Sequence, residues 1–242
     1  MRWIKMGKAM RKYLFIFLTA ILVATSFSVS TFAKVLGSDI RTQVTNTASY
    51  PNSAIVHLDG VLSNTGEYGC TGWMVGPKTL VTAAHCVNGG TTSMTVSPGK
   101  NGGSNPYGTA KISQVYISPN YINTENPGDD WAVININRNL GDQTSWFGYN
   151  SGLPNGSITV TGYPGDKSYG QMWTGVGSIE WSTGNIAYHN VDTFGGQSGA
   201  PVYDYRREVY AIHVGYDGNY NKNRAARITS EVINVIETMK RQ

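Results

Sequence analysis

The chain is poor in charge. Lys, Arg, Asp and Glu make up 14% of its 242 residues, whereas about 25% is usual. Aromatic residues nevertheless make up 11%, and a disordered protein has more charge and fewer aromatic residues. No internal repeat of fixed period and no block of like charge is visible. These absences argue against a disordered chain or a repeat array and favour a folded domain.

Metal-ligating residues are also scarce. The chain has two cysteines and four histidines. The histidines show no paired-ligand spacing, and two cysteines alone cannot make a structural zinc site. We therefore expect no metal and no cofactor.

Long apolar runs are missing too. Residues 13–24 form an apolar run of about a dozen residues, short of the roughly 20 that a membrane-spanning helix needs. A charged stretch precedes the run, and small and polar residues follow it up to Ala33. This order is typical of a secretory signal peptide, although a retained anchor is the alternative. We predict that residues 1–33, or 1–34, are removed and that the mature protein is secreted, without membrane association.

The positive charge of the chain lies in this leader. The whole chain has 19 Lys and Arg against 15 Asp and Glu, a formal net charge of +4. Residues 1–34 hold six of the cations and no acid, which leaves residues 35–242 with 13 cations and 15 acids. A basic chain suggests a nucleic-acid or anionic partner. The mature part is near neutral, so we expect no nucleic-acid partner.

The remaining chain has the pattern of an all-β protein. Short alternating apolar runs are separated by Gly, Asn and Pro, which is typical of antiparallel barrels or a sandwich. The runs cover residues 54–58, 79–83, 111–117, 131–136, 157–162 and 208–214. Only the C-terminal end, which Thr229 or Ser230 can cap, predicts a helix.

The two cysteines, Cys70 and Cys86, are expected to form a disulfide, because an even pair is typical of an exported chain. Free thiols, or Cys86 acting as a nucleophile beside His85, are the alternatives. Adjacent residues on a strand point to opposite faces, which disfavours a Cys86–His85 pair.

Three local motifs carry chemistry: T-A-A-H-C ending at Cys86, D-D-W-A-V from Asp129, and G-G-Q-S-G-A-P around Ser198. A serine hydroxyl needs a base to become nucleophilic, and its attack on a carbonyl builds an oxyanion that needs preorganised donors. Glycines let the backbone turn its N–H groups into one pocket. The order His…Asp…Ser differs from that of the subtilisins and the α/β-hydrolases.

With these motifs the chain resembles the chymotrypsin-like serine endopeptidases and, among them, the bacterial glutamyl endopeptidases. A cysteine sixteen residues before Cys86 and the stretches 160–167 and 211–215 also match. The resemblance implies two antiparallel six-stranded β-barrels. Residues 35–145 would form the first, with His85 and Asp130. Residues 146–242 would form the second, with Ser198 and the C-terminal helix.

The resemblance also implies roles. Ser198 would be the nucleophile, His85 the general base, and Asp130, which matches the motif better than Asp129, would orient His85. The backbone N–H groups of Gly196 and Ser198 would form the oxyanion hole.

Thr193 and His213 match the residues that bind an acidic P1 side chain in this subfamily. Asp192 stands where trypsin-like enzymes carry the acid that selects Lys or Arg. We expect Asp192 to point away from the pocket, because an acid there would oppose His213. Trypsin-like or broad P1 specificity is the alternative.

The mature amino terminus is predicted at Lys34 or Val35, because residues 35–39 resemble the mature start of these enzymes. We therefore expect little or no zymogen control. Gln197 replaces the aspartate that pairs with the new amino terminus in chymotrypsin, so that switch should be absent.

The sequence thus predicts a secreted, monomeric serine endopeptidase that cleaves polypeptides through an acyl-enzyme and prefers Glu at P1. A non-catalytic homologue that binds a ligand is the rival outside the enzymes.

Overall fold

Residues 33–62, 66–89 and 94–242 are described by a computed structural model of the chain. Residues 1–32, which make up nearly all of the predicted signal peptide, lie outside this part. Among the residues that the structure describes, none of the helices has both the length and the apolarity that crossing a bilayer requires.

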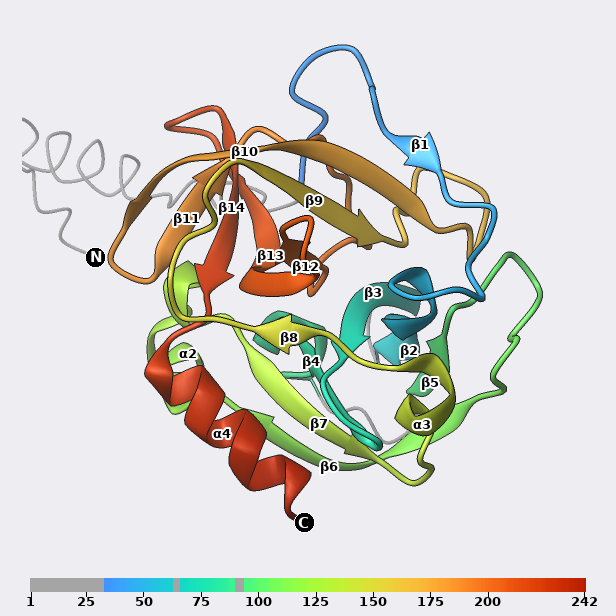
Figure 1. Cartoon of the computed structure of the whole chain (residues 1–242). Helices are drawn as coiled ribbons and strands as arrows, with labels where there is room; N and C mark the ends of the chain where they lie inside the picture. Colours follow the sequence, from blue (N-terminus) through green and yellow to red (C-terminus); the bar gives the residue numbers. More distant parts are fainter. Residues whose placement is uncertain (1–32, 63–65, 90–93) are drawn as a thin grey trace, which may run out of the picture. The chain divides into compact units, whose positions relative to one another are not determined.

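Six antiparallel strands close the first barrel, in the order β2-β3-β4-β7-β6-β5. The strands are β2 (Ile55–Leu62), β3 (Gly66–Met74), β4 (Thr79–Thr82), β5 (Thr95–Pro98), β6 (Ala110–Ile117) and β7 (Ala132–Ile136). All residues of β4 and β7 are buried, because both faces of these two strands are covered. Figure 1 shows this barrel in cyan to green.

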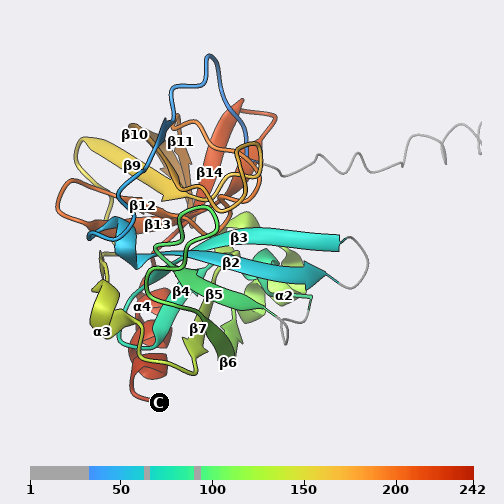
Figure 2. The same ribbon diagram turned by 90° about the vertical axis from the view of Figure 1, so that its right-hand side faces the viewer.

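Six more strands form a second closed ring, in the order β10-β11-β14-β13-β12-β9, which the β9–β10 pairing completes. The strands are β9 (Ser157–Gly162), β10 (Trp173–Thr183), β11 (Ile186–His189), β12 (Pro201–Tyr203), β13 (Glu208–Asp217) and β14 (Lys222–Arg227). Two short strands join this sheet from outside: β1 (Thr42–Gln43) pairs with β10, and β8 (Gly148–Tyr149) pairs parallel with β13. Figure 2 shows the two barrels one above the other.

The predicted all-β fold of two six-stranded barrels is confirmed, and each predicted apolar run overlaps a strand. Short helical segments were not predicted from the sequence. They are η1 (Asn52–Ala54), η2 (Ala84–Cys86), α2 (Pro119–Thr124), η3 (Pro127–Asp129) and α3 (Gly141–Thr144). Local caps explain two of them, because Ser118 caps α2 and Asn126 caps η3.

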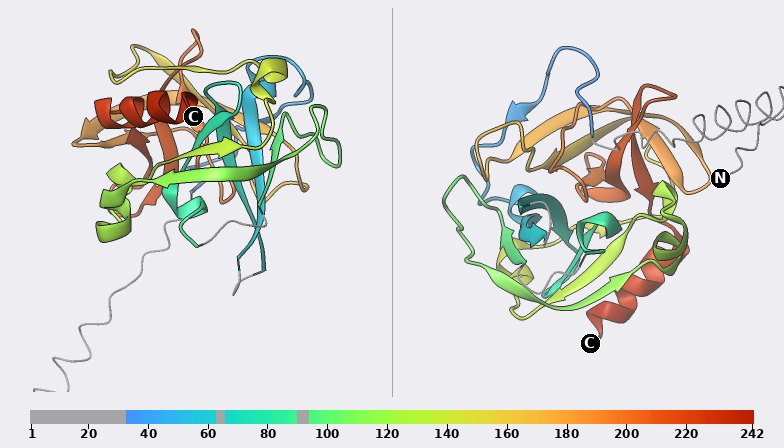
Figure 3. Two further views of the ribbon diagram at one scale, coloured as in Figure 1. Left: turned by 90° about the horizontal axis from the view of Figure 1, so that it is seen from below. Right: turned by 180° about the vertical axis from the view of Figure 1, so that it is seen from behind.

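The C-terminal helix α4 (Ser230–Lys240) begins after Thr229, whose hydroxyl accepts from the backbone N–H of Val232. The expectation that it packs on the second barrel is wrong. It contacts β4 and β7 of the first barrel, and Figure 3 shows it along the outside of that barrel. The physical reason is its apolar stripe, which joins the core of the first barrel. The side chain of Asn135 on β7 also donates to the carbonyl of Met239.

Candidate active site

His85 lies on the turn η2, between β4 and the rest of the first barrel. The prediction that it lies on a strand is wrong, because β4 ends at Thr82 and residues 84–86 form a turn of 3-10 helix. A disulfide joins Cys86 to Cys70 on β3, with 6.2 Å between the Cα atoms. The bond fixes the turn that carries His85 and leaves no thiol at either cysteine, so the thiol-nucleophile alternative is excluded.

Asp130 follows η3 and directly precedes β7. Its Oδ2 lies 2.6 Å from His85 Nδ1, and its Oδ1 accepts from the backbone N–H of His85 at 2.9 Å. Both carboxylate oxygens thus hold one residue, which fixes the orientation of the imidazole. The neighbouring Asp129 instead accepts from the Asn185 side chain. The structure thus brings Asp130, and not Asp129, into contact with His85.

The environment makes His85 more basic. Burial lowers the pKa of His85, but the negative charge of Asp130 and its hydrogen bond raise that pKa by more, so it lies above 6.5. With Nδ1–H donating to Asp130, Nε2 keeps its lone pair. His85 therefore carries a proton acceptor whose conjugate acid Asp130 stabilises.

Ser198 lies between the barrels and is half-buried. Its carbonyl accepts from Thr71 N at 2.8 Å and lies 3.7 Å from Cys86 Sγ. Gly199 next to it has φ +86°, and a Cβ there would lie 2.1 Å from the Thr71 carbonyl. The backbone at Ser198 is thus held against β3 and the disulfide that carries His85. Within the described residues, the Ser198 hydroxyl makes no hydrogen bond to His85.

The backbone before Ser198 turns its carbonyls toward the protein. Gly195 O accepts from Gly165 N at 2.7 Å, and Gly196 O accepts from the Thr71 hydroxyl at 2.9 Å. Gly196 has φ +98°, and a Cβ there would lie 2.5 Å from the Tyr163 carbonyl. Among the described residues, no acceptor takes the backbone N–H of Gly196 or Ser198. Two N–H groups are therefore available for a ligand oxygen.

Thr193 and His213 are both fully buried. Thr193 Oγ1 and His213 Nε2 have no hydrogen-bond partner in the described part of the chain. On its other side, His213 Nδ1 lies 3.1 Å from Nε2 of His189 on β11. Burial lowers the pKa of His189 to about 3 and that of His213 well below 6.5. Both imidazoles are therefore neutral at pH 7. Sequence reasoning missed His189, because only the pairing of β11 with β14 and of β14 with β13 places it near His213.

Asp192 faces the amino-terminal segment. Its two oxygens accept from the backbone N–H groups of Leu36 at 2.8 Å and Ile40 at 3.2 Å. This agrees with the expectation that Asp192 points away from the pocket.

The start of the same segment is anchored on β14. Asn223 accepts from Lys34 N at 2.9 Å and donates to Lys34 O at 2.6 Å. Lys34 O also accepts from Thr193 N at 3.2 Å. The predicted mature amino terminus therefore lies beside Thr193.

Two cavities lie next to His85 and next to the turn before Ser198. One, of about 180 Å³, is lined by His85, Asp130 and Arg224 among others. The other, of about 470 Å³, is lined by Gly195, Gly196 and neighbouring residues. One cavity thus lies at His85, and the other lies at the glycines that precede Ser198.

The fold and the site define a class of protein, and comparison with known proteins gives the same class. The trypsin family model matches residues 43–236. The chain belongs to the trypsin family and is a chymotrypsin-type serine endopeptidase.

Within that family the chain is similar to bacterial glutamyl endopeptidases. It is 38% identical over 223 residues to the glutamyl endopeptidase of Bacillus licheniformis, an alignment that covers 85% of this chain and 69% of that protein. It is 37% identical over 218 residues to a Bacillus subtilis protein named extracellular metalloprotease, with the same coverage. A solved structure of a Glu endopeptidase aligns with a TM-score of 0.77 and 28% identity, covering 86% of this chain and all of that one.

The name of the B. subtilis relative implies a metal ion, and the donors present can be tested for one. In the part of the chain that the structure describes, the cluster of potential ligands is Cys70, His85 and Cys86. The two sulfurs are bonded to each other, so neither is a thiolate, and one imidazole remains. These residues do not fit a metal ion.

Proposed function

We propose that the protein is a secreted serine endopeptidase that hydrolyses peptide bonds through His85, Asp130 and Ser198 and prefers glutamate at P1. The observation that carries the proposal is the pair of Asp130 contacts that orients His85. The N–H groups of Gly196 and Ser198, which have no acceptor within the described part of the chain, support it.

The reaction uses these groups in order. Ser198 Oγ attacks the scissile carbonyl while His85 Nε2 takes its proton, and Asp130 stabilises the imidazolium. The carbonyl oxygen becomes an oxyanion that accepts from the N–H groups of Gly196 and Ser198. The C–N bond then breaks, and His85 gives its proton to the leaving amine. Water hydrolyses the acyl-enzyme by the same steps, with His85 again acting as base.

The buried donors near β13 support an acidic P1 side chain. With His189 Nε2–H donating to His213 Nδ1, His213 carries its own hydrogen on Nε2, the atom that has no partner among the residues that the structure describes. That N–H and the Thr193 hydroxyl can both donate to a carboxylate. A buried donor that stays unpaired is costly, so a ligand that accepts from both is favoured.

The contacts of Asp192 count against a trypsin-like pocket. Its oxygens already accept from Leu36 and Ile40. An acid held by backbone N–H groups in this way is not presented to the side chain of a substrate lysine or arginine.

The specificity test compares kcat/KM for peptides that differ only at P1: Glu, Gln, Asp, Lys and Arg. We expect Glu to be cleaved fastest. Thr193→Val or His213→Leu should lower the Glu/Gln ratio by about tenfold or more, since each removes a hydrogen bond to a charged group. Cleavage only after Lys or Arg would overturn the acidic assignment.

The catalytic test is covalent labelling by a fluorophosphonate. We expect labelling at Ser198 that is lost in Ser198→Ala, together with a fall in kcat of roughly 10⁶-fold. A wild-type protein that binds peptides but is neither labelled nor active would be a non-catalytic binding protein.

Secretion is proposed from the leader, and the name of the B. subtilis relative supports it. Amino-terminal sequencing of protein from the culture medium should give a start at Lys34 or Val35. A start well beyond Val35 would contradict the idea that there is little or no propeptide.

A further inference from the structure

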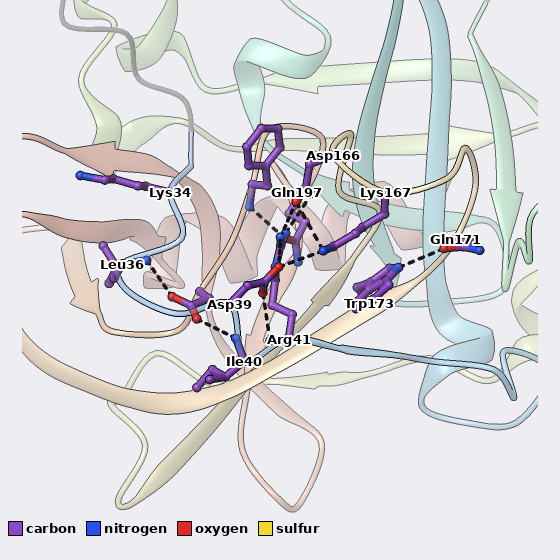
Figure 4. A network of polar contacts seen from close by, with 12 residues as sticks. Lys34, Leu36, Asp39, Ile40, Arg41, Asp166, Lys167, Gln171, Trp173 and Gln197 are labelled. Carbon is purple, nitrogen blue, oxygen red and sulfur yellow. Dashed lines mark hydrogen bonds and ion pairs between the residues drawn. The ribbon is translucent and has the colours of Figure 1, made fainter.

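Arg41, directly before β1, is a buried cation with an unusual set of acceptors. Its guanidinium is fully buried and makes two-pronged contacts to two acids (Figure 4). Nε and Nη2 lie 2.9 and 2.8 Å from Asp39, while Nη1 and Nη2 lie 3.2 and 2.6 Å from Asp166. Lys167 also contacts Asp39, at 2.9 Å. Two cations and two acids thus balance in one cluster.

The same guanidinium reaches the residue before Ser198. Arg41 Nη1 donates to Gln197 Oε1 at 3.3 Å, and this oxygen also accepts from Phe194 N at 3.0 Å. Gln197 N in turn donates to Phe194 O at 3.0 Å. Gln197 is fully buried. The side chain and the backbone of Gln197 therefore both close the turn 194–197. Arg41 holds the side-chain oxygen of Gln197 in place by the hydrogen bond from Nη1.

Asp166 connects Arg41 to the other wall of this turn. The loop that carries Asp166 includes Gly165, which donates to Gly195 O, and Tyr163, whose carbonyl lies against Gly196. One side chain thus contacts both the turn and the loop that shapes it. Both contacts use the fixed fork of the guanidinium, which a lysine does not have.

Stability alone does not explain this arrangement. Desolvation of a buried ion pair costs about as much as its attraction gains. Asp39, two residues away, and Asp166 already neutralise the cation. The contact to neutral Gln197 adds no charge balance, but it does fix the backbone that presents the N–H groups of Gly196 and Ser198.

We propose that Arg41 is a positioning residue for the oxyanion hole and acts through Gln197 and Asp166. This inference rests on the proposed function, in which those two N–H groups bind the oxyanion. Because the cation is a side chain of the folded segment, the shape of the turn does not depend on whether Lys34 or Val35 begins the mature chain.

The test compares Arg41→Met with Arg206→Met, which makes the same change at a largely exposed arginine paired with Asp204. Substrates are peptide p-nitroanilides with Glu at P1. We expect Arg41→Met to lower kcat about 10- to 100-fold, short of the 10²- to 10³-fold loss for a deleted oxyanion donor, while KM changes less than about threefold. Arg206→Met should match the wild type.

A second measurement separates positioning from general damage. A peptide boronic acid of the same sequence forms a tetrahedral adduct at Ser198, whereas the product peptide acid only fills the pocket. Arg41→Met should weaken boronate binding by the factor lost in kcat and leave product binding unchanged. A folded variant with wild-type kcat, or with equal losses for both ligands, overturns the inference.

If Arg41→Met fails to fold, Arg41→Lys is tested in its place, because it keeps the buried positive charge. Its single ammonium cannot hold Asp166 and Gln197 together, so kcat should fall, and adding Gln197→Glu should restore part of it by attracting the ammonium. If the loss of kcat in the double variant is simply the product of the losses in Arg41→Lys and Gln197→Glu, the inference is overturned. Fluorophosphonate labelling of wild-type Ser198 separates the two failures: without labelling the proposed function fails, and with labelling only the role of Arg41 fails.

Discussion

The two apolar clusters of the protein differ in the size of their side chains. The core of the first barrel contains large side chains such as Trp73, Trp131 and Leu80. The separate cluster inside the second barrel consists of alanines, valines and one isoleucine. Beside that cluster lie buried polar residues, among them His189 and His213. Large side chains of the second barrel, such as Tyr203 and Ile212, instead belong to the cluster that fills the first barrel. The small side chains of the separate cluster therefore leave room beside them for the two buried histidines.

Unpaired polar atoms follow the same division. Among the described residues, buried side-chain atoms without a partner occur at His57 and Trp73 in the first barrel. In the second-barrel half they occur at His189, Thr193, Gln197, His213, Arg224 and Arg227. Buried donors without partners cost stability. Their concentration around the candidate pocket suggests that the first barrel supplies rigidity and the second supplies recognition.

Among changes in the first barrel and its loops, the largest expected effect comes from Asp130. Asp130→Asn should lower kcat about 10⁴-fold, because an amide favours the wrong tautomer of His85. The acid limb of kcat/KM should also move to lower pH in this variant, since the charge of Asp130 no longer raises the pKa of His85. Asp129→Asn is the matched control and should behave like the wild type. A pH–rate profile checks both, and an unmoved acid limb would contradict the assignment.

Sequence reasoning found the strands and the three motifs because these are local patterns. It did not find Arg41, whose contacts to Asp166 and Gln197 span 125 and 156 positions. It placed α4 on the wrong barrel, because helical spacing identifies the apolar face of a helix but not the surface which that face covers. Residues whose role depends on a distant partner carry no local signal.

Packing gives the next largest effect. Leu80→Ala on β4 removes a large, fully buried side chain and should lower the free energy of unfolding by about 2–5 kcal/mol. Val202→Ala, in the second cluster, removes fewer atoms and should cost about 1–2 kcal/mol. Urea unfolding in a Ser198→Ala background, which prevents self-digestion, measures both. Equal losses would break the contrast between the two cores.

Acid should destabilise the protein through its buried histidines. Burial lowers the pKa of His57 to about 4 and that of His189 to about 3, against about 6.5 when unfolded. Below pH 6.5 only the unfolded chain takes up these protons, so stability is full above that pH and falls as the pH drops toward the folded values. The loss is up to about 1.4 kcal/mol per pH unit for each histidine. His189→Gln should flatten the pH dependence of urea unfolding between pH 6.5 and 5, and an unchanged slope would count against it.

The smallest effect tests to which barrel the C-terminal helix belongs. Thr229→Ala removes the hydroxyl that accepts from Val232 N at the start of α4 and should cost about 1 kcal/mol. Thr238→Ala removes a hydroxyl that donates to Asn234 O within the helix and accepts from the exposed side chain of Arg241, and should be nearly neutral. Because α4 covers β4 and β7, the loss of the cap should speed amide hydrogen exchange in those strands before it does so in β9 or β12. Faster exchange in the second barrel alone would mean that the helix stabilises the recognition half instead.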